Sequence, residues 1–163
     1  MNKAITLAAC VAVGVALGGT LRTSAQTNDP RIGRWQLNLA KSKFTGTPPK
    51  SIMRLYEDRG GGIVLYTGTT VTPAGMTNAT LVLYKLDGKD YPQVPKGAET
   101  VTVVSQRLSD PHTIEAVTKQ NGKIVGTFTQ TVSGDGKTLT YMPKDANGKW
   151  NGTVQVFDKQ STS

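Results

Sequence analysis

The sequence predicts an all-β protein, an antiparallel meander that closes into an eight- or nine-stranded lipocalin-like barrel. Three observations support this fold class. Apolar and polar residues alternate with a period of two, most clearly over Ile32–Phe44, where Trp35, Leu37 and Leu39 alternate with polar or small residues. Clusters of Gly, Asn, Asp and Pro recur about every dozen residues, the spacing typical of sandwiches and barrels. No segment shows the apolar spacing of an amphipathic helix.

Residues 1–25 predict a secretory signal peptide. Lys3 gives a positive start, Ala4–Gly19 is an uncharged apolar run, and Thr23-Ser24-Ala25 offers a small-residue cleavage site. The apolar run is shorter than the ~20 residues that a membrane helix needs. We therefore expect a secreted or periplasmic bacterial protein, without stable membrane insertion, whose single β-barrel domain spans residues 26–163. An uncleaved amino-terminal anchor is the alternative.

Each expected strand ends at a residue cluster that favours a turn. The strands are expected at 34–43, 51–57, 63–72, 76–86, 99–108, 113–120, 123–133, 137–143 and 150–158. The turn signals that separate them lie at 45–49, 57–62, 73–75, 87–88, 92–97, 109–111, 121–122, 134–136 and 147–148. Asn121-Gly122 is the strongest hairpin signal, because both residue types adopt the positive φ that a tight hairpin requires. Short turns imply antiparallel neighbours, and closing the sheet removes its exposed edges.

Aromatic residues in the expected strands suggest a ligand-binding lumen. Alternation places Val64 and Tyr66 on one face of their strand, and Ile63, Leu65 and Thr67 on the other. A buried tyrosine has an apolar body and a polar hydroxyl, which suits an amphipathic ligand. Tyrosine is also common in strands for reasons of β-propensity alone, so both interpretations stay open. The candidate ligand-binding residues are Tyr56, Tyr66, Tyr84, Phe128 and Tyr141.

Gly33-Arg34-Trp35, at the start of the first expected strand, resembles the opening of lipocalin-type (calycin) barrels and of fatty-acid-binding proteins. The stretch GRWQLNLAKSKF, with PPKS, DGKDYP, HTIEA, GDGKTLT and VFDKQ, is similar to small secreted bacterial lipocalin-like proteins of uncertain function. The resemblance implies a barrel with Trp35 as a structural plug at its closed end. The Thr-Asp-Tyr of the second lipocalin block is absent, and the helical lid of fatty-acid-binding proteins has no room between Phe44 and Ser51.

The residue types present disfavour catalysis and metal binding. The single cysteine, Cys10, falls in the signal peptide, so the mature protein is expected to lack disulfides and a thiol nucleophile. The single histidine, His112, follows Asp110-Pro111 in an expected turn, and one histidine without cysteine cannot form a metal site. Glu115 is expected to face outward. A Glu115 inside the barrel, paired with a second acid, would instead suggest a hydrolase.

The charge of the chain is modestly basic and dispersed. The formal net charge is +8, and loss of Lys3 and Arg22 with the signal peptide would leave +6, from 17 basic and 11 acidic residues. No basic cluster of the kind that binds nucleic acid is present. We expect a monomeric, non-catalytic protein that binds a small apolar or amphipathic ligand without a cofactor. The alternative is a solid barrel that acts in protein interaction or envelope stress through a loop surface at Tyr91–Gly97.

Overall fold

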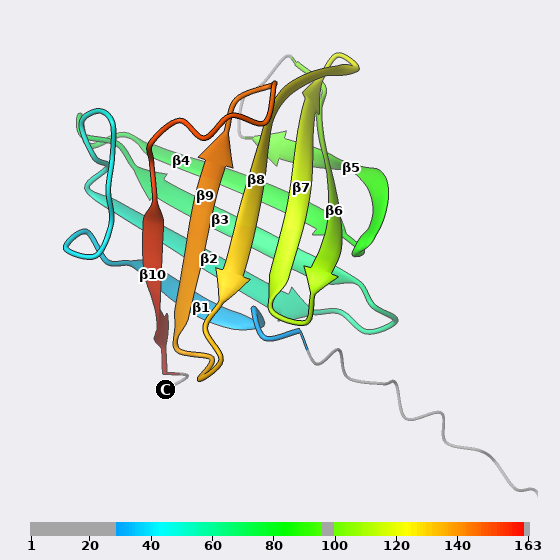
Figure 1. Cartoon of the computed structure of the whole chain (residues 1–163), viewed down its shortest axis with the longest axis horizontal. Coiled ribbons are helices and arrows are strands. Elements are labelled where there is room, and N and C mark those ends of the chain that lie inside the picture. The colour runs from blue at the N-terminus through cyan, green and yellow to red at the C-terminus, as the bar shows by residue number, and fades with distance from the viewer. Residues whose placement is uncertain (1–28, 96–99, 162–163) are drawn as a thin grey trace, which may run out of the picture.

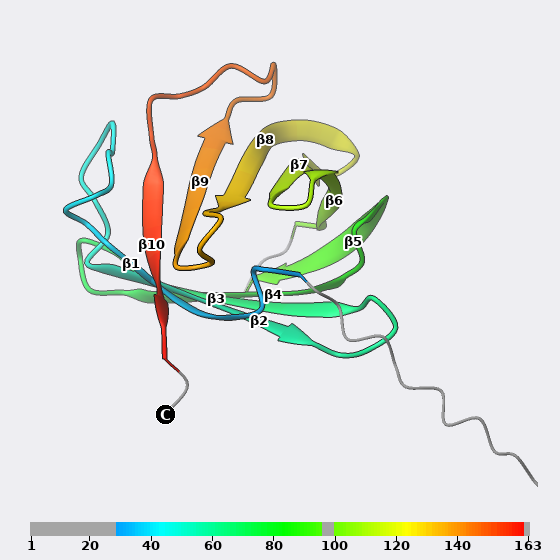
Figure 2. The same ribbon diagram turned by 60° about the horizontal axis from the view of Figure 1, so that its bottom comes forward.

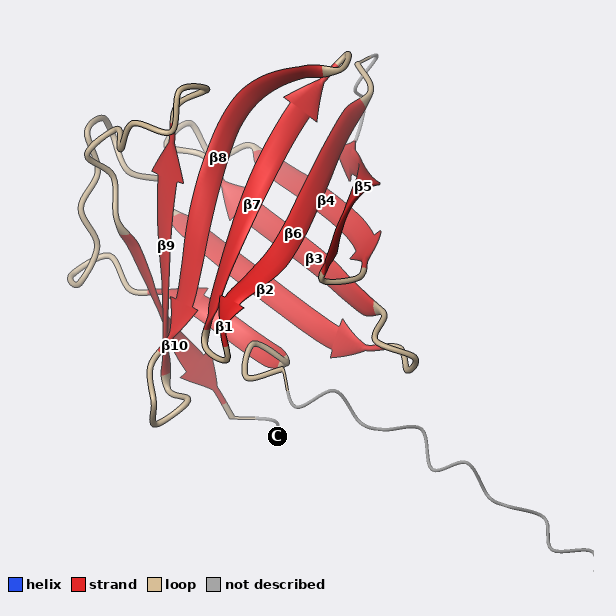
Figure 3. Ribbon diagram, turned by 45° about the vertical axis from the view of Figure 1, so that its right-hand side comes forward, coloured by secondary structure: helices blue, strands red, loops and turns tan. Residues whose placement is uncertain are grey.

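A computed structural model describes residues 29–95 and 100–161, in which ten antiparallel strands close into a barrel (Figure 1). The predicted signal peptide lies outside these residues. The strands are β1 (Gly33–Leu37), β2 (Ser51–Asp58), β3 (Val64–Val71), β4 (Thr77–Tyr84), β5 (Asp87–Pro95), β6 (Thr102–Asp110), β7 (Thr113–Gln120), β8 (Lys123–Val132), β9 (Thr138–Lys144) and β10 (Gln155–Gln160). Figure 3 shows that the described chain consists of strands and loops. The described residues contain no helix that is long and apolar enough to cross a membrane.

Each strand pairs with the strands next to it in the sequence, and the pair β1–β10 closes the barrel. In Figure 1, β6 to β9 run steeply across the front of the molecule, and β2 to β4 cross behind them at a slant. The predicted all-β meander and its closure are confirmed, with ten strands rather than eight or nine. Residues 38–50 connect β1 to β2, and the part from Phe44 onward forms no helix, as its short length predicted.

The additional strand is β5, a segment for which two turns were predicted. Gly88 has a φ of 75° and sits at an irregularity in the pairing of β5 with β6, between Asp87 and Asp90. Pro92 pairs with Val103 of β6, whereas β4 pairs with β5 only at residues 93–95. The β4 side of Pro92 therefore behaves as a strand edge, where a residue without an N–H group is tolerated.

The first strand is shorter than predicted because Asn38 starts a turn. The Asn38 side-chain oxygen accepts the backbone N–H of Lys41 at 3.1 Å, and its backbone carbonyl accepts the hydroxyl of Ser42 at 2.6 Å. Side chains of this kind compete with the strand for backbone hydrogen bonds. Regular pairing consequently ends at Leu37, and only a single bridge between Lys43 and Val154 follows.

Strand β8 bends sharply, as Figures 2 and 3 show. Its pairing with β7 shifts between Thr118 and Lys119, which pair with Gly126 and Ile124 and leave Val125 as an extra residue. An extra residue of this kind is a β-bulge, which bends the strand that carries it. The bend lets β8 follow the wall of the barrel over its whole length.

One end of the barrel is closed around Trp35, which has no exposed surface. The indole N–H of Trp35 donates to the backbone carbonyl of Arg31 at 2.7 Å, and the Lys159 ammonium lies 5.1 Å from the ring centroid. Arg31 is itself buried in an ion pair of 2.6 Å with Asp29. Trp35 is thus buried against the segment that leads into β1, and its role as a structural plug stays a prediction.

The hairpin at Asn121-Gly122 has the geometry that the sequence predicted, with φ of 50° and 77°. We expect Gly122→Ala to lower the free energy of unfolding by about 1–2 kcal/mol, because an L-residue is strained at positive φ. Chemical denaturation measures this loss. Gly134→Ala is the matched control: both glycines face open space, but Gly134 does not have a positive φ. Equal losses in the two variants would contradict the conformational explanation.

Candidate ligand-binding site

A cavity of about 220 Å³ lies inside the barrel. Its walls come from eight strands, β2 to β9. The lining residues are Arg54, Tyr56, Tyr66, Thr80, Val82, Gln93, Val104, Gln106, Thr118, Phe128, Gln130 and Tyr141. The period of two places these residues inside, since alternate residues of each strand share one face. The cavity thus combines apolar and aromatic walls with several hydrogen-bonding side chains.

Four of the five predicted ligand-binding residues line this cavity. Tyr56 and Tyr66 form one pair of rings with centroids 5.0 Å apart, and Phe128 and Tyr141 form a second pair at the same distance. The fifth, Tyr84, is buried but is not among the lining residues. It lies toward the closed end, where the Arg31 guanidinium carbon is 5.8 Å from its ring centroid. The proposed role of these residues in binding stays a prediction.

Arg54 is the charged residue among those that line the cavity, and it was not among the predicted ligand-binding residues. Its guanidinium carbon lies 4.3 Å from the ring centroid of Tyr141 and 4.6 Å from that of Phe157. One terminal nitrogen donates to the Gln155 side-chain oxygen at 3.3 Å. The buried Nε of Arg54 has no hydrogen-bond partner, and Arg54 forms no ion pair with an acidic residue of the described chain. The signal that could have found Arg54 is its place between Ile52 and Tyr56, on the inward face of β2.

The electrostatics of the cavity favour an anion. Burial opposes the charge of Arg54, but Tyr66, Tyr56 and Tyr141 favour it, so the pKa of Arg54 lies above its ordinary value. Burial raises the pKa of Tyr66 to about 12, although the nearby charge of Arg54 opposes this rise. At neutral pH the cavity therefore contains a charged guanidinium beside protonated tyrosine hydroxyls, which can donate hydrogen bonds. Gln130 already donates to the Tyr56 hydroxyl at 2.7 Å, which fixes that ring in place.

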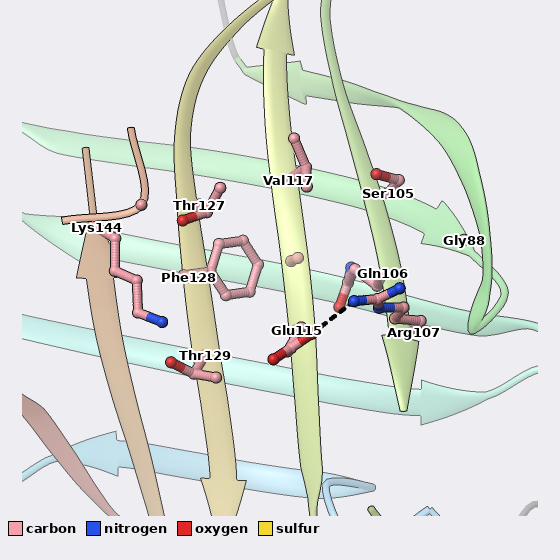
Figure 4. Close-up of a pocket in the computed structure, with 12 residues that line it drawn as sticks. Gly88, Ser105, Gln106, Arg107, Glu115, Val117, Thr127, Phe128, Thr129 and Lys144 are labelled. Atoms are coloured by element: carbon pink, nitrogen blue, oxygen red, sulfur yellow. Dashed lines mark hydrogen bonds and ion pairs between the residues drawn. The ribbon is translucent and has the colours of Figure 1, made fainter. Parts of the chain in front are cut away.

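Two larger hollows lie outside the interior. One, of about 490 Å³, covers the outer face of β6 to β8, where Glu115 and Arg107 form an ion pair of 2.9 Å (Figure 4). The other, of about 760 Å³, is a mostly apolar groove at the closed end, beside Pro30, Leu86 and Leu108. Neither combines a buried charge with an aromatic wall, so the smaller interior cavity is the better candidate despite its size.

The remaining candidate residues lie on the surface. Glu115 faces outward, as expected, and its side chain is 47% exposed in the pair with Arg107. His112 is exposed in a turn, where its backbone N–H donates to Asp110 at 2.8 Å. Among the residues that the structure describes, no three His, Cys, Asp or Glu side chains lie close enough to hold a metal ion. The alternative prediction placed a loop surface at Tyr91–Gly97, but residues 91–95 belong to strand β5. Residues 96 and 97 lie outside the described chain.

Comparison with known proteins identifies the fold alone. No family model matches the chain, and no curated protein sequence matches it. Among solved structures, a point mutant of the fluorescent protein UnaG is similar, with a TM-score of 0.57 and 14% sequence identity. The match covers 82% of this chain and 98% of the UnaG chain. The protein therefore has a calycin-type barrel, the fold that the Gly33-Arg34-Trp35 opening suggested.

Proposed function

We propose that the protein binds a small amphipathic acid inside the barrel and leaves it chemically unchanged. The observation that carries this proposal is Arg54, a buried guanidinium with an unpartnered Nε and no ion pair with an acidic residue of the described chain. Burying a charge is costly unless a counter-charge and hydrogen bonds compensate it. A carboxylate from the ligand would supply both.

The shape of the guanidinium supports a carboxylate as the preferred group. Arginine presents its donors in a planar fork that matches the two oxygens of a carboxylate. Tyr66 and Tyr141 lie beside Arg54 and add hydroxyl donors. The apolar part of the ligand would contact Val82, Val104 and Phe128 on the other walls of the cavity.

The volume of the cavity limits the size of the ligand. At about 220 Å³ it is smaller than the ~300–1,000 Å³ typical of pockets for drug-sized ligands. A short- or medium-chain acid is therefore the ligand that we propose.

The proposal extends to the location and the mode of action of the protein. The apolar run and cleavage site in residues 1–25 support export, so we propose a secreted or periplasmic protein. We further propose that it acts as a monomer, without a cofactor and without nucleic acid. The outward position of Glu115, held in an ion pair with Arg107, supports binding rather than hydrolysis inside the barrel.

Calorimetric titration of the purified, delipidated protein tests this function. The probes are octanoate and octanol, which share an apolar tail and differ in the head group. We expect octanoate to bind at least about 30-fold more tightly than octanol, because an interaction with a buried charge is worth about 2 kcal/mol or more. Equal binding of the acid and the alcohol would rule out the role of Arg54, and absence of binding by a homologous series of acids would rule out the proposed function.

A further inference from the structure

Gly68 occupies a position on the inner face of β3 where any side chain would enter the cavity. It pairs with Arg54 of β2 on one side and with Thr80 of β4 on the other, and both of these residues line the cavity. Gly68 is buried and lacks a positive φ, so the backbone conformation does not require glycine there. The space around Gly68 therefore decides which side chains this position accepts.

The side chain of Tyr66 fills that space. Tyr66 stands two residues before Gly68 on the same face of β3, and its ring lies along the strand over Gly68. A Cβ atom at Gly68 would overlap the Tyr66 hydroxyl oxygen and would lie 2.8 Å from Cζ and 3.3 Å from Cε1 of the ring. These atoms belong to one side chain, so an alanine at this position would push the Tyr66 ring away from β3.

We infer that Gly68 and Tyr66 together determine the length of the ligand that the barrel accepts. With glycine at 68, the Tyr66 ring lies against the wall of β3 and leaves the interior open to the chain of the ligand. Displaced from the wall, the ring would occupy part of a cavity of only about 220 Å³. Val82 of β4, which pairs with Tyr66 of β3, also lines the cavity. A Tyr66 ring pushed off β3 would therefore enter the space that the ligand would occupy. This inference rests on the proposed binding of an acid in the interior.

The test compares Gly68→Ala with the wild type over straight-chain acids from butanoate to dodecanoate. We expect Gly68→Ala to lower the affinity for the longest acid that the wild type accepts at least tenfold more than it lowers the affinity for the shortest bound acid, which loses only the Tyr66 hydroxyl. In a Tyr66→Leu background, the same Gly68→Ala change is expected to alter the length preference less than twofold, because the ring is gone. Gly134→Ala, in an exposed turn, is the control for substitution of a glycine.

A crystal structure of unliganded Gly68→Ala provides the second measurement. We expect the Tyr66 ring to have moved off β3, with a smaller cavity and an intact barrel. Acid binding with an unchanged length preference, or a Tyr66 ring that stays in place, overturns this inference and leaves the proposed function standing. A wild-type protein that binds no acid of the series overturns the proposed function, and with it the role of Gly68 in ligand length.

Discussion

Trp35→Ala is expected to lower the free energy of unfolding by about 3–5 kcal/mol, the usual cost of removing a buried tryptophan. Trp35 is completely buried and lies between the Arg31 backbone and Lys159 at the closed end of the barrel. The substitution leaves a cavity and removes the indole N–H that donates to the backbone carbonyl of Arg31. Urea denaturation followed by far-ultraviolet circular dichroism measures the loss, because the fluorescence of the variant comes from Trp150 alone.

Trp150→Ala is the matched control for this substitution. Trp150 is 43% exposed in the connection between β9 and β10, and its indole N–H donates to the Thr153 carbonyl at 2.8 Å. We expect this variant to lose about 1 kcal/mol, the typical contribution of one hydrogen bond. Losses of the same size in the two variants would show that Trp35 is an ordinary contact rather than the plug of the barrel.

Arg54→Met is expected to separate binding from stability. Methionine keeps the length and apolar character of the side chain but removes the charge, so the affinity for octanoate should fall about 30-fold or more. The free energy of unfolding should stay the same or rise by about 1–4 kcal/mol, as when a buried charge is replaced by an apolar residue of similar volume. Calorimetric titration and urea denaturation measure these two quantities on the same preparation.

Arg107→Met is the control for Arg54→Met. The Arg107 side chain is 72% exposed and forms its ion pair with Glu115 on the outer face, remote from the interior. We expect no change in octanoate affinity and a change in stability of less than about 1 kcal/mol, since exposed ion pairs contribute little. A strong loss of stability in Arg54→Met, with octanoate affinity retained, would assign Arg54 a purely structural role.

The barrel could be predicted because strand periodicity and turn chemistry are local properties of the sequence. Val64 and Tyr66 alternate with Leu65 and Thr67, and the structure places the first pair inside. Strand β5 could not be predicted in the same way, since Gly88 and Pro92 are ordinarily turn residues. Whether a proline is tolerated in a strand depends on which neighbour needs its N–H group, and only the tertiary pairing with β4 and β6 decides that.

The lining of the interior cavity was predicted in part, and the residues that were missed are those that depend on tertiary contacts. Tyr56, Tyr66, Phe128 and Tyr141 were selected because aromatic residues in strands often face a core. Arg54 was missed because arginine in a strand usually faces water. Gly68 was missed because nothing in its sequence neighbourhood shows that the Tyr66 ring lies across it; that contact appears only when both side chains are placed on the inner face of β3.

The central claim is that Arg54 pairs with the acid group of a ligand held inside the barrel. The most direct measurement follows the side-chain Nε–Hε resonance of Arg54 by nuclear magnetic resonance, assigned with the Arg54→Met variant, during titration with octanoate and then with octanol. We expect octanoate to shift this resonance saturably and to slow its exchange with water, and octanol to leave it in place. An octanoate titration that leaves Arg54 unchanged but shifts the resonances of Leu86 and Leu108 would place the ligand in the end groove and contradict the claim.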